Sequence, residues 1–160
     1  TPGLELRPAD ALSIGRAAVA SAAQAHPETP FGLEETQPVG DVQADPEQLR
    51  RALHNLLINA AEAAPGRPVT LAVGGGPGRD RWWVAVRDEG PGLPEEIAAH
   101  WGEPYHTTRE GGTGLGLTVA LQVVEAHGGR LEARPRPGGG LEVFASLHRR
   151  PRVVEPSEET

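Results

Sequence analysis

The chain of 160 residues contains no cysteine, no methionine and no lysine. Without cysteine it has no disulfide bonds, no thiolate metal site and no cysteine nucleophile. Because all 15 cationic residues are arginines, the chain cannot build a P-loop or a eukaryotic-type protein kinase site, since both need a lysine. The missing initiator methionine predicts that this sequence is a piece of a longer protein.

Aromatic residues and long apolar runs are also scarce. No apolar run approaches the ~18 residues of a membrane-spanning helix, and the start of the chain has no signal-peptide pattern. The formal net charge of −7 argues against a general nucleic-acid surface. The length suggests one domain with a sizeable core, which we place at residues 1–148, followed by a disordered polar tail at 149–160.

Helix-like and strand-like segments are mixed along the chain. Three long helices are predicted: 8–26 with Asp10 as a cap, 46–64 opened by Asp45-Pro46, and 115–127 ended by Gly128-Gly129. The polar stretch that follows the fourth strand holds a short predicted helix, 94–100. Strands are predicted at 31–36, 39–44, 68–73, 81–88, 129–135 and 140–147. We therefore expect an α+β fold in two layers, with helices on one face of a mostly antiparallel sheet.

The second predicted helix has two unlike faces. Small and leucine side chains share one face, and polar side chains share the other: Leu49, Leu53, Leu56, Ala60 and Ala64 against Arg51, Asn55, Asn59 and Glu62. A solvated surface is the simpler interpretation. Two asparagines one turn apart are nevertheless poor helix formers, and their amide oxygens are good ligands for a hard cation such as Mg²⁺.

A carboxylate followed by glycines ends the fourth predicted strand, in the stretch "RDEGPGLP" around Asp88. This stretch is either an ordinary loop or a site that a flat ring can approach. A carboxylate accepts a hydrogen bond from the exocyclic amine of adenine and repels the carbonyl of guanine. Such a charged hydrogen bond is worth roughly 1.5–3 kcal/mol, which is enough to select one base.

The stretch "REGGTGLGL" places glycines where the third long helix begins. Backbone N–H groups at a helix start, together with the helix dipole, favour phosphate. A dinucleotide-binding motif is disfavoured, because no strand precedes these glycines and only about 28 residues follow Glu132, too few for a doubly wound sheet.

The order of these features resembles the ATPase domain of bacterial sensor histidine kinases, in the superfamily shared with DNA gyrase, the heat-shock chaperone ATPases and MutL. "HNLLINAAEA" looks like the N box, "DEGPGLP" the G1 box, "EPYHTTR" the F box and lid, and "GGTGLGL" the G2 box. The likeness runs from about residue 5 to 148 and is strongest to the nitrogen-regulation branch. It implies the two-layer α/β sandwich called the Bergerat fold.

The resemblance also implies roles for single residues. Asp88 would bind the adenine amine, Asn59 with Asn55 would hold Mg²⁺ against the phosphates of ATP, and 107–109 would belong to a lid. The expected nucleotide contacts are Asn55, Asn59, Glu62, Asp88, Gly90, Gly92, Leu93, Tyr105, Thr107, Thr108, Arg109, Gly112, Thr113, Gly114, Leu115, Gly116 and Leu117. Some positions depart from the commonest pattern: Glu62, Glu89, Trp101 and Arg109.

Asn55 bears on the reaction. The hydrolytic members resemble each other in having glutamate at this position to activate water, whereas asparagine cannot act as a general base. The resemblance therefore implies transfer of the γ-phosphoryl group to a histidine. The alternatives are a nucleotide-binding module without catalysis, a serine kinase, and a hydrolase of the same superfamily.

The acceptor histidine is not evident among the six histidines, none of which lies in a phosphoacceptor context. We interpret His127 as a helix-end residue and His54 as a packing residue, with His106 in the lid. The acceptor and the base are then expected in dimerisation helices outside this sequence. The resemblance further implies a response-regulator receiver domain as partner, a monomeric fragment of a homodimeric protein, and a cytoplasmic domain whose full-length protein has an unknown relation to the membrane.

Overall fold

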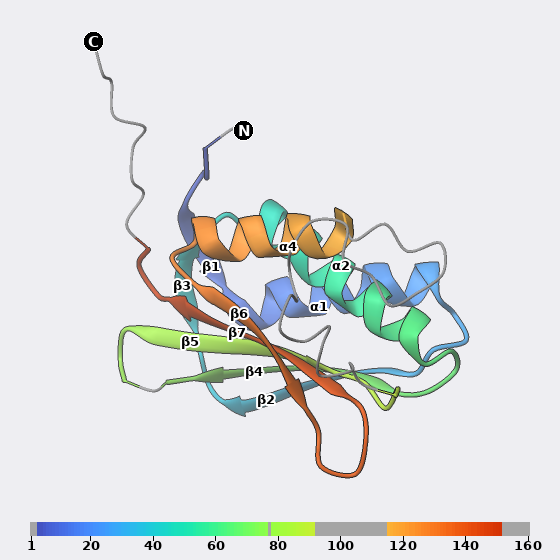
Figure 1. Cartoon of the computed structure of the whole chain (residues 1–160). Coiled ribbons are helices and arrows are strands. Elements are labelled where there is room, and N and C mark those ends of the chain that lie inside the picture. The colour runs from blue at the N-terminus through green and yellow to red at the C-terminus, as the bar shows by residue number, and fades with distance from the viewer. Residues whose placement is uncertain (1–2, 77, 92–114, 152–160) are drawn as a thin grey trace.

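The computed structural model describes residues 3–76, 78–91 and 115–151, with only the backbone described at Leu115 and Gly116. Among these residues, three helices cover one face of a five-stranded sheet, and a two-stranded sheet adjoins them (Figure 1). The described elements are β1 (Arg7–Asp10), α1 (Ala11–Ala25), β2 (Phe31–Gln37), β3 (Asp41–Ala44), α2 (Pro46–Ala63), β4 (Val69–Gly75), β5 (Arg81–Arg87), α4 (Leu115–Ala126), β6 (Arg130–Pro135) and β7 (Leu141–His148). The predicted α+β class is confirmed.

The large sheet has the strand order β2-β4-β5-β7-β6. Its pairs are antiparallel except for β2 and β4, which run parallel with Phe31 opposite Val69. A parallel pair needs a crossover connection rather than a tight turn, and α2 supplies that connection here. The mostly antiparallel sheet predicted from the two hairpins is therefore confirmed.

The predicted helix start at residue 8 is wrong. Pro8 and Ala9 belong to β1, which pairs antiparallel with β3 through Arg7 opposite Ala44. Asp10 is nevertheless the N-cap, and its carboxylate accepts from the backbone N–H of Ser13 at 3.0 Å. The pairing with β3 overrides the local sequence because it satisfies backbone groups that a helix start would leave without partners.

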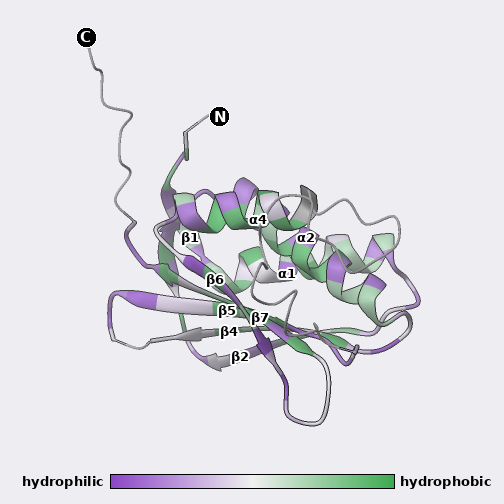
Figure 2. Cartoon of the chain, in the orientation of Figure 1, coloured by the Kyte–Doolittle hydropathy of each residue, from purple (hydrophilic) through white to green (hydrophobic). Residues whose placement is uncertain are grey.

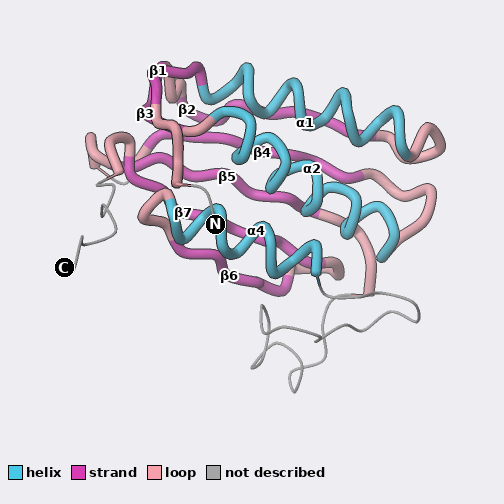
Figure 3. The backbone as a smooth tube through the Cα atoms, turned by 90° about the horizontal axis from the view of Figure 1, so that it is seen from above, coloured by secondary structure: helices cyan, strands magenta, loops and turns pink. Residues whose placement is uncertain are grey.

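The helices pack side by side with α2 between α1 and α4 (Figure 3). Apolar and polar bands alternate along α2 and α4 (Figure 2), as amphipathic helices on a sheet require. The apolar face predicted for α2 is buried in full, and it packs over the central strands. Its buried members are Leu49, Leu53, Leu56, Ala60 and the C-cap residue Ala64.

The end of the domain is anchored by Arg149. Its backbone N–H donates to the carbonyl of Asp80 at 2.7 Å, and its carbonyl accepts from Gln43 N–H at 2.8 Å. Its Nη1 also donates to the carbonyl of Val39 at 2.5 Å. These bonds tie the residue after β7 to three other segments, whereas residues 152–160 of the predicted tail lie outside the described part.

Candidate nucleotide site

Asp88 lies directly after β5 and is 5% exposed. Its Oδ1 accepts from the backbone N–H of Gly90 at 2.9 Å and from that of Leu141 at 3.1 Å. Both hydrogen bonds that the described residues give this carboxylate therefore end on one oxygen atom. The side chain is fixed in orientation by backbone donors on two segments, which suits a recognition role.

Gly90 brings the loop after β5 against the end of α2. A Cβ atom at Gly90 would lie 3.2 Å from Asp88 Oδ1, 3.3 Å from the carbonyl oxygen of Ala63 and 3.4 Å from the Ala64 side chain. These separations are tighter than usual side-chain contacts, so a side chain here would push the loop away from the helix. The absence of a side chain thus keeps Asp88 beside α2.

The polar face of α2 belongs to the same helix that this loop approaches. Asn55 and Asn59 are half-buried, whereas Arg51 and Glu62 are exposed. The carboxylate of Glu62 lies 4.0 Å from Nε2 of His26. The asparagine pair supplies amide oxygens on one helix face, which fits a hard cation that keeps water and phosphate oxygens as its other ligands. Within the described ranges, no group of three or more histidine, cysteine or carboxylate side chains gathers as a metal site.

The predicted phosphate segment is described only from Leu115, where helix α4 begins. This helix packs beside α2. Leu117 is half-buried and packs against the core. Most of the predicted lid and phosphate contacts lie outside the described residues: Gly92, Leu93, Tyr105, Thr107, Thr108, Arg109, Gly112, Thr113 and Gly114. Leu115 and Gly116 are described in their backbone only, and Trp101, His106 and the predicted helix 94–100 lie outside the described residues.

Sequence reasoning missed the β6–β7 turn at this site. Arg136 Nη1 donates to the backbone carbonyl of Asp88 at 2.6 Å, and Asp88 N–H donates to the carbonyl of Leu141 at 3.0 Å. The signal in the sequence was three consecutive glycines at 138–140, which is more than a tight turn requires.

His54 lies between two helices and His127 directly follows α4, in line with the predicted packing and helix-end roles. His54 Nδ1 lies 2.9 Å from Ser21 Oγ between α2 and α1, and burial together with the nearby Arg50 and His26 lowers the pKa of this imidazole. His127 is 1% exposed, and its Nε2 accepts from the backbone N–H of Asp45 at 3.0 Å. Burial lowers the pKa of His127, against smaller opposing effects of the Val123 carbonyl and the Asp45 carboxylate.

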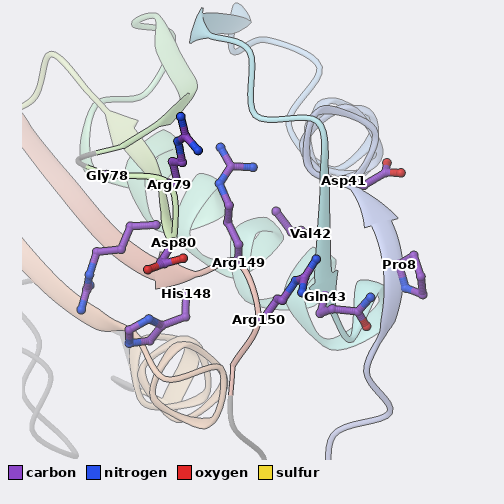
Figure 4. A pocket seen from close by; sticks show the side chains of 11 residues that line it. Pro8, Asp41, Val42, Gln43, Gly78, Arg79, Asp80, His148, Arg149 and Arg150 are labelled. Carbon is purple, nitrogen blue, oxygen red and sulfur yellow. The ribbon is translucent and has the colours of Figure 1, made fainter.

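A separate hollow of about 830 Å³ lies at the opposite end of β5 from Asp88 (Figure 4). It is bordered by the β4–β5 turn, the end of β7 and the β1–β3 pair, with Asp80, His148 and Arg149 among its lining residues. Charges of both signs line it, and none of the predicted nucleotide contacts is among its described lining residues. It is therefore not the predicted nucleotide site.

Helices α1, α2 and α4 over the β2-β4-β5-β7-β6 sheet define a two-layer α/β sandwich of the Bergerat type. A family model described as histidine kinase-, DNA gyrase B- and HSP90-like ATPase matches residues 44–151. The chain belongs to this family, and it is an ATP-binding catalytic domain of the kind found in sensor histidine kinases. Within the described residues, no helix is both long and apolar enough to cross a membrane.

The individual matches come from the same group. Sensor histidine kinase ZraS of Klebsiella oxytoca is 43% identical over 102 residues, which are 62% of this chain and 21% of that protein. Nitrogen regulation protein NtrY of Azorhizobium caulinodans is 38% identical over 123 residues, which are 71% of this chain and 15% of that protein. The chain thus spans about a fifth or less of the length of these curated relatives.

Solved structures show the same fold. The catalytic domain of histidine kinase ThkA superposes with a TM-score of 0.82 at 24% identity, covering 92% of this chain and 98% of that one. Mycobacterial sensor histidine kinase MprB superposes with a TM-score of 0.80 at 26% identity, covering 92% and 99%. The expected Bergerat fold is therefore confirmed.

Proposed function

We propose that this domain binds Mg-ATP between α2, the end of β5 and the start of α4, and transfers the γ-phosphoryl group to a histidine supplied by another domain. The buried carboxylate of Asp88 carries the proposal, because two backbone donors hold its Oδ1 and Oδ2 is then the atom for the exocyclic amine of adenine. Asn59 and Asn55 would hold Mg²⁺, which neutralises phosphate charge when it is bound.

Transfer requires a nucleophile that this site does not itself provide. Asn55 offers an amide where a water-activating carboxylate would be needed, so bound ATP is shielded from hydrolysis rather than activated for it. The lone pair of an imidazole nitrogen would attack the γ-phosphorus atom while the bond to the β–γ bridging oxygen breaks. ADP leaves with that oxygen, and the proton on the other ring nitrogen passes to a base outside this sequence.

The relatives support a place in two-component signalling. ThkA, which shares this fold, has been solved in complex with the response regulator protein TrrA. We extend this to the present domain and propose a receiver domain as its downstream partner, with dimerisation helices as the source of the acceptor histidine. We also propose a cytoplasmic location, where ATP is available, and a dimer formed by the longer protein rather than by this domain.

Calorimetry with Mg-ATP and Mg-GTP tests the binding half of the proposal. The wild-type domain should bind ATP in preference to GTP, and Asp88→Asn should weaken ATP binding by roughly 10- to 100-fold, since a charged hydrogen bond is lost. The matched control is Glu89→Gln, which removes the adjacent carboxylate of an exposed ion pair with Arg67. A folded wild-type domain that binds neither nucleotide would contradict the proposal. It would indicate a degenerate domain that has lost nucleotide binding.

Radiolabelled ATP tests the transfer half. With a histidine-bearing dimerisation domain added, label should appear on that domain and be lost in acid, as a phosphorus–nitrogen bond requires. Acid-stable label on serine would indicate the serine kinase instead. ADP release at the same rate with and without the acceptor would indicate a hydrolase.

A further inference from the structure

The β6–β7 turn lies against the main chain of Asp88, because β7 pairs directly with β5. Arg136 lies 48 residues from Asp88 in sequence, and its Nη1 lies 2.6 Å from the Asp88 carbonyl oxygen. A guanidinium is a charged donor, and its hydrogen bonds are shorter and stronger than those between neutral groups. The contact therefore strongly restrains the peptide group that joins Asp88 to Glu89.

The shape of the turn brings Arg136 to this position. Arg136 N–H donates to the carbonyl of Gly140 at 3.1 Å, and Gly139 N–H donates to that of Arg136 at 3.1 Å. The glycines at 138–140 all have positive φ, with Gly140 at +98°. A Cβ atom at Gly140 would collide with the Asp88 carbonyl oxygen, so only glycine lets the turn close on that carbonyl.

Asp88 is consequently held on three sides by one hairpin. Its N–H donates to the Leu141 carbonyl, its Oδ1 accepts from Leu141 N–H, and its carbonyl accepts from Arg136. Leu141 makes the first two bonds through its backbone, so they do not require a leucine side chain. Of the two partners on the hairpin, only Arg136 contributes a side chain.

We propose that Arg136 is a positioning residue for Asp88 and thereby sets the preference of the site for adenine over guanine. The proposal rests on the proposed function, in which Asp88 reads the base. With the main chain on both sides of Asp88 fixed, the carboxylate meets the exocyclic amine in one orientation. Without Arg136 the carboxylate is still present but loses that orientation, so the selective part of binding is lost first.

Calorimetric titration of Mg-ATP and Mg-GTP into the wild-type domain, Arg136→Met, Arg136→Lys and Arg134→Met tests this. We expect Arg136→Met to weaken ATP binding about tenfold, the scale of one charged hydrogen bond, and to change GTP binding less, so that the ratio of the two affinities falls. Arg136→Lys, which can still donate to the carbonyl, should recover most of the ratio.

Arg134→Met is the matched control. Arg134 lies on the same hairpin, pairs with Glu132 at 3.0 Å and lies over the Phe144 ring at 4.0 Å. The control removes the same charge but has no described contact with Asp88, and it should leave the affinity ratio unchanged. Melting temperatures of all four proteins show whether any loss reflects unfolding.

The outcomes separate the two proposals. If the folded wild-type domain binds no ATP, both the proposed function and this inference fail. If the wild-type domain prefers ATP but Arg136→Met leaves the ratio unchanged, only this inference fails. An equal loss of ATP and GTP affinity in Arg136→Met would also overturn it. That result would show that Arg136 attracts the phosphates of either nucleotide and does not affect base selection.

Discussion

The imidazole of His127 joins helix ends that lie 82 residues apart in sequence, because its Nε2 accepts the backbone N–H of Asp45, the N-cap of α2. The other ring nitrogen, Nδ1, lies 2.8 Å from the carbonyl of Val123 in α4. An Nε2 that accepts cannot carry a proton, so the neutral tautomer with hydrogen on Nδ1 is the one that fits. One side chain thus fixes the α2 start to the α4 end.

Stability should fall in mild acid because of His127. Its pKa in the folded domain is lowered by burial, whereas the unfolded chain has the ordinary value of about 6.5. Its contribution is complete above that pH and is lost as the pH falls towards the folded pKa, because the unfolded state then binds the proton preferentially.

Urea denaturation between pH 8 and pH 5 measures this effect, with His127→Gln as the comparison. At pH 8 the variant should lose about 1–3 kcal/mol, as expected for disrupted buried hydrogen bonds. Its free energy of unfolding should also fall less steeply with acid. His54, whose pKa is lowered too, contributes equally to both proteins and cancels in the difference. Parallel pH profiles would contradict the assignment.

Gly140→Ala should destabilise the domain far more than Gly138→Ala. Both glycines have positive φ, which costs an alanine about 1–2 kcal/mol. At Gly140 the new Cβ also collides with the Asp88 carbonyl, whereas at Gly138 nothing lies within 4 Å. We expect a total loss above about 3 kcal/mol for Gly140→Ala in urea denaturation, together with weaker ATP binding. Equal losses in the two variants would show that the turn adapts.

A chain ending at His148 should be less stable than one ending at Pro151. The shorter chain lacks the three described hydrogen bonds of Arg149 to Asp80, Gln43 and Val39, worth about 2–4 kcal/mol together. The longer one keeps them and also keeps Pro151, which is buried. Thermal melts of both chains beside the 160-residue protein measure the difference. Identical melting temperatures would mean that the domain ends at residue 148 in energetic terms.

Asn59→Ala should remove the magnesium dependence of ATP binding. In the wild-type domain, we expect calorimetry to show tighter binding with Mg²⁺ than with EDTA, because Asn55 and Asn59 would hold the ion and its charge would offset that of the phosphates. The variant should bind with the same affinity in both conditions. Arg51→Gln, an exposed change on the same face of α2, should keep the dependence. If the variant still binds ATP more tightly with Mg²⁺, then Asn55 or another residue is the magnesium ligand.

Local signals predicted much of this fold. The capping residues Asp10 and Asp45 lie at the starts of α1 and α2 and bond the N–H groups of Ser13 and Gln48. Gly128, with φ of +75°, ends α4 where the double glycine predicted it. Such features depend on neighbours within a few residues, so single-sequence reasoning finds them.

Contacts between distant segments were beyond that reasoning. The strand at Pro8 and Ala9 exists because β3 pairs with it. The local sequence, which is rich in alanine, does not predict a strand there. In the candidate site, Asp88 was recognisable by its place before two glycines. Its partner Arg136 was not, because the contact depends on how two hairpins lie in the sheet, and the glycines at 138–140 indicate only an unusual turn.

The sheet ends at β2 on one side and β6 on the other. Exposed edge strands invite pairing with another chain, and charged side chains oppose it. Here β2 exposes Glu34 and Glu35, while β6 exposes Glu132 and Arg134 and ends at Pro135. The domain should consequently stay dispersed at high protein concentration, because its copies do not pair edge to edge into extended sheets.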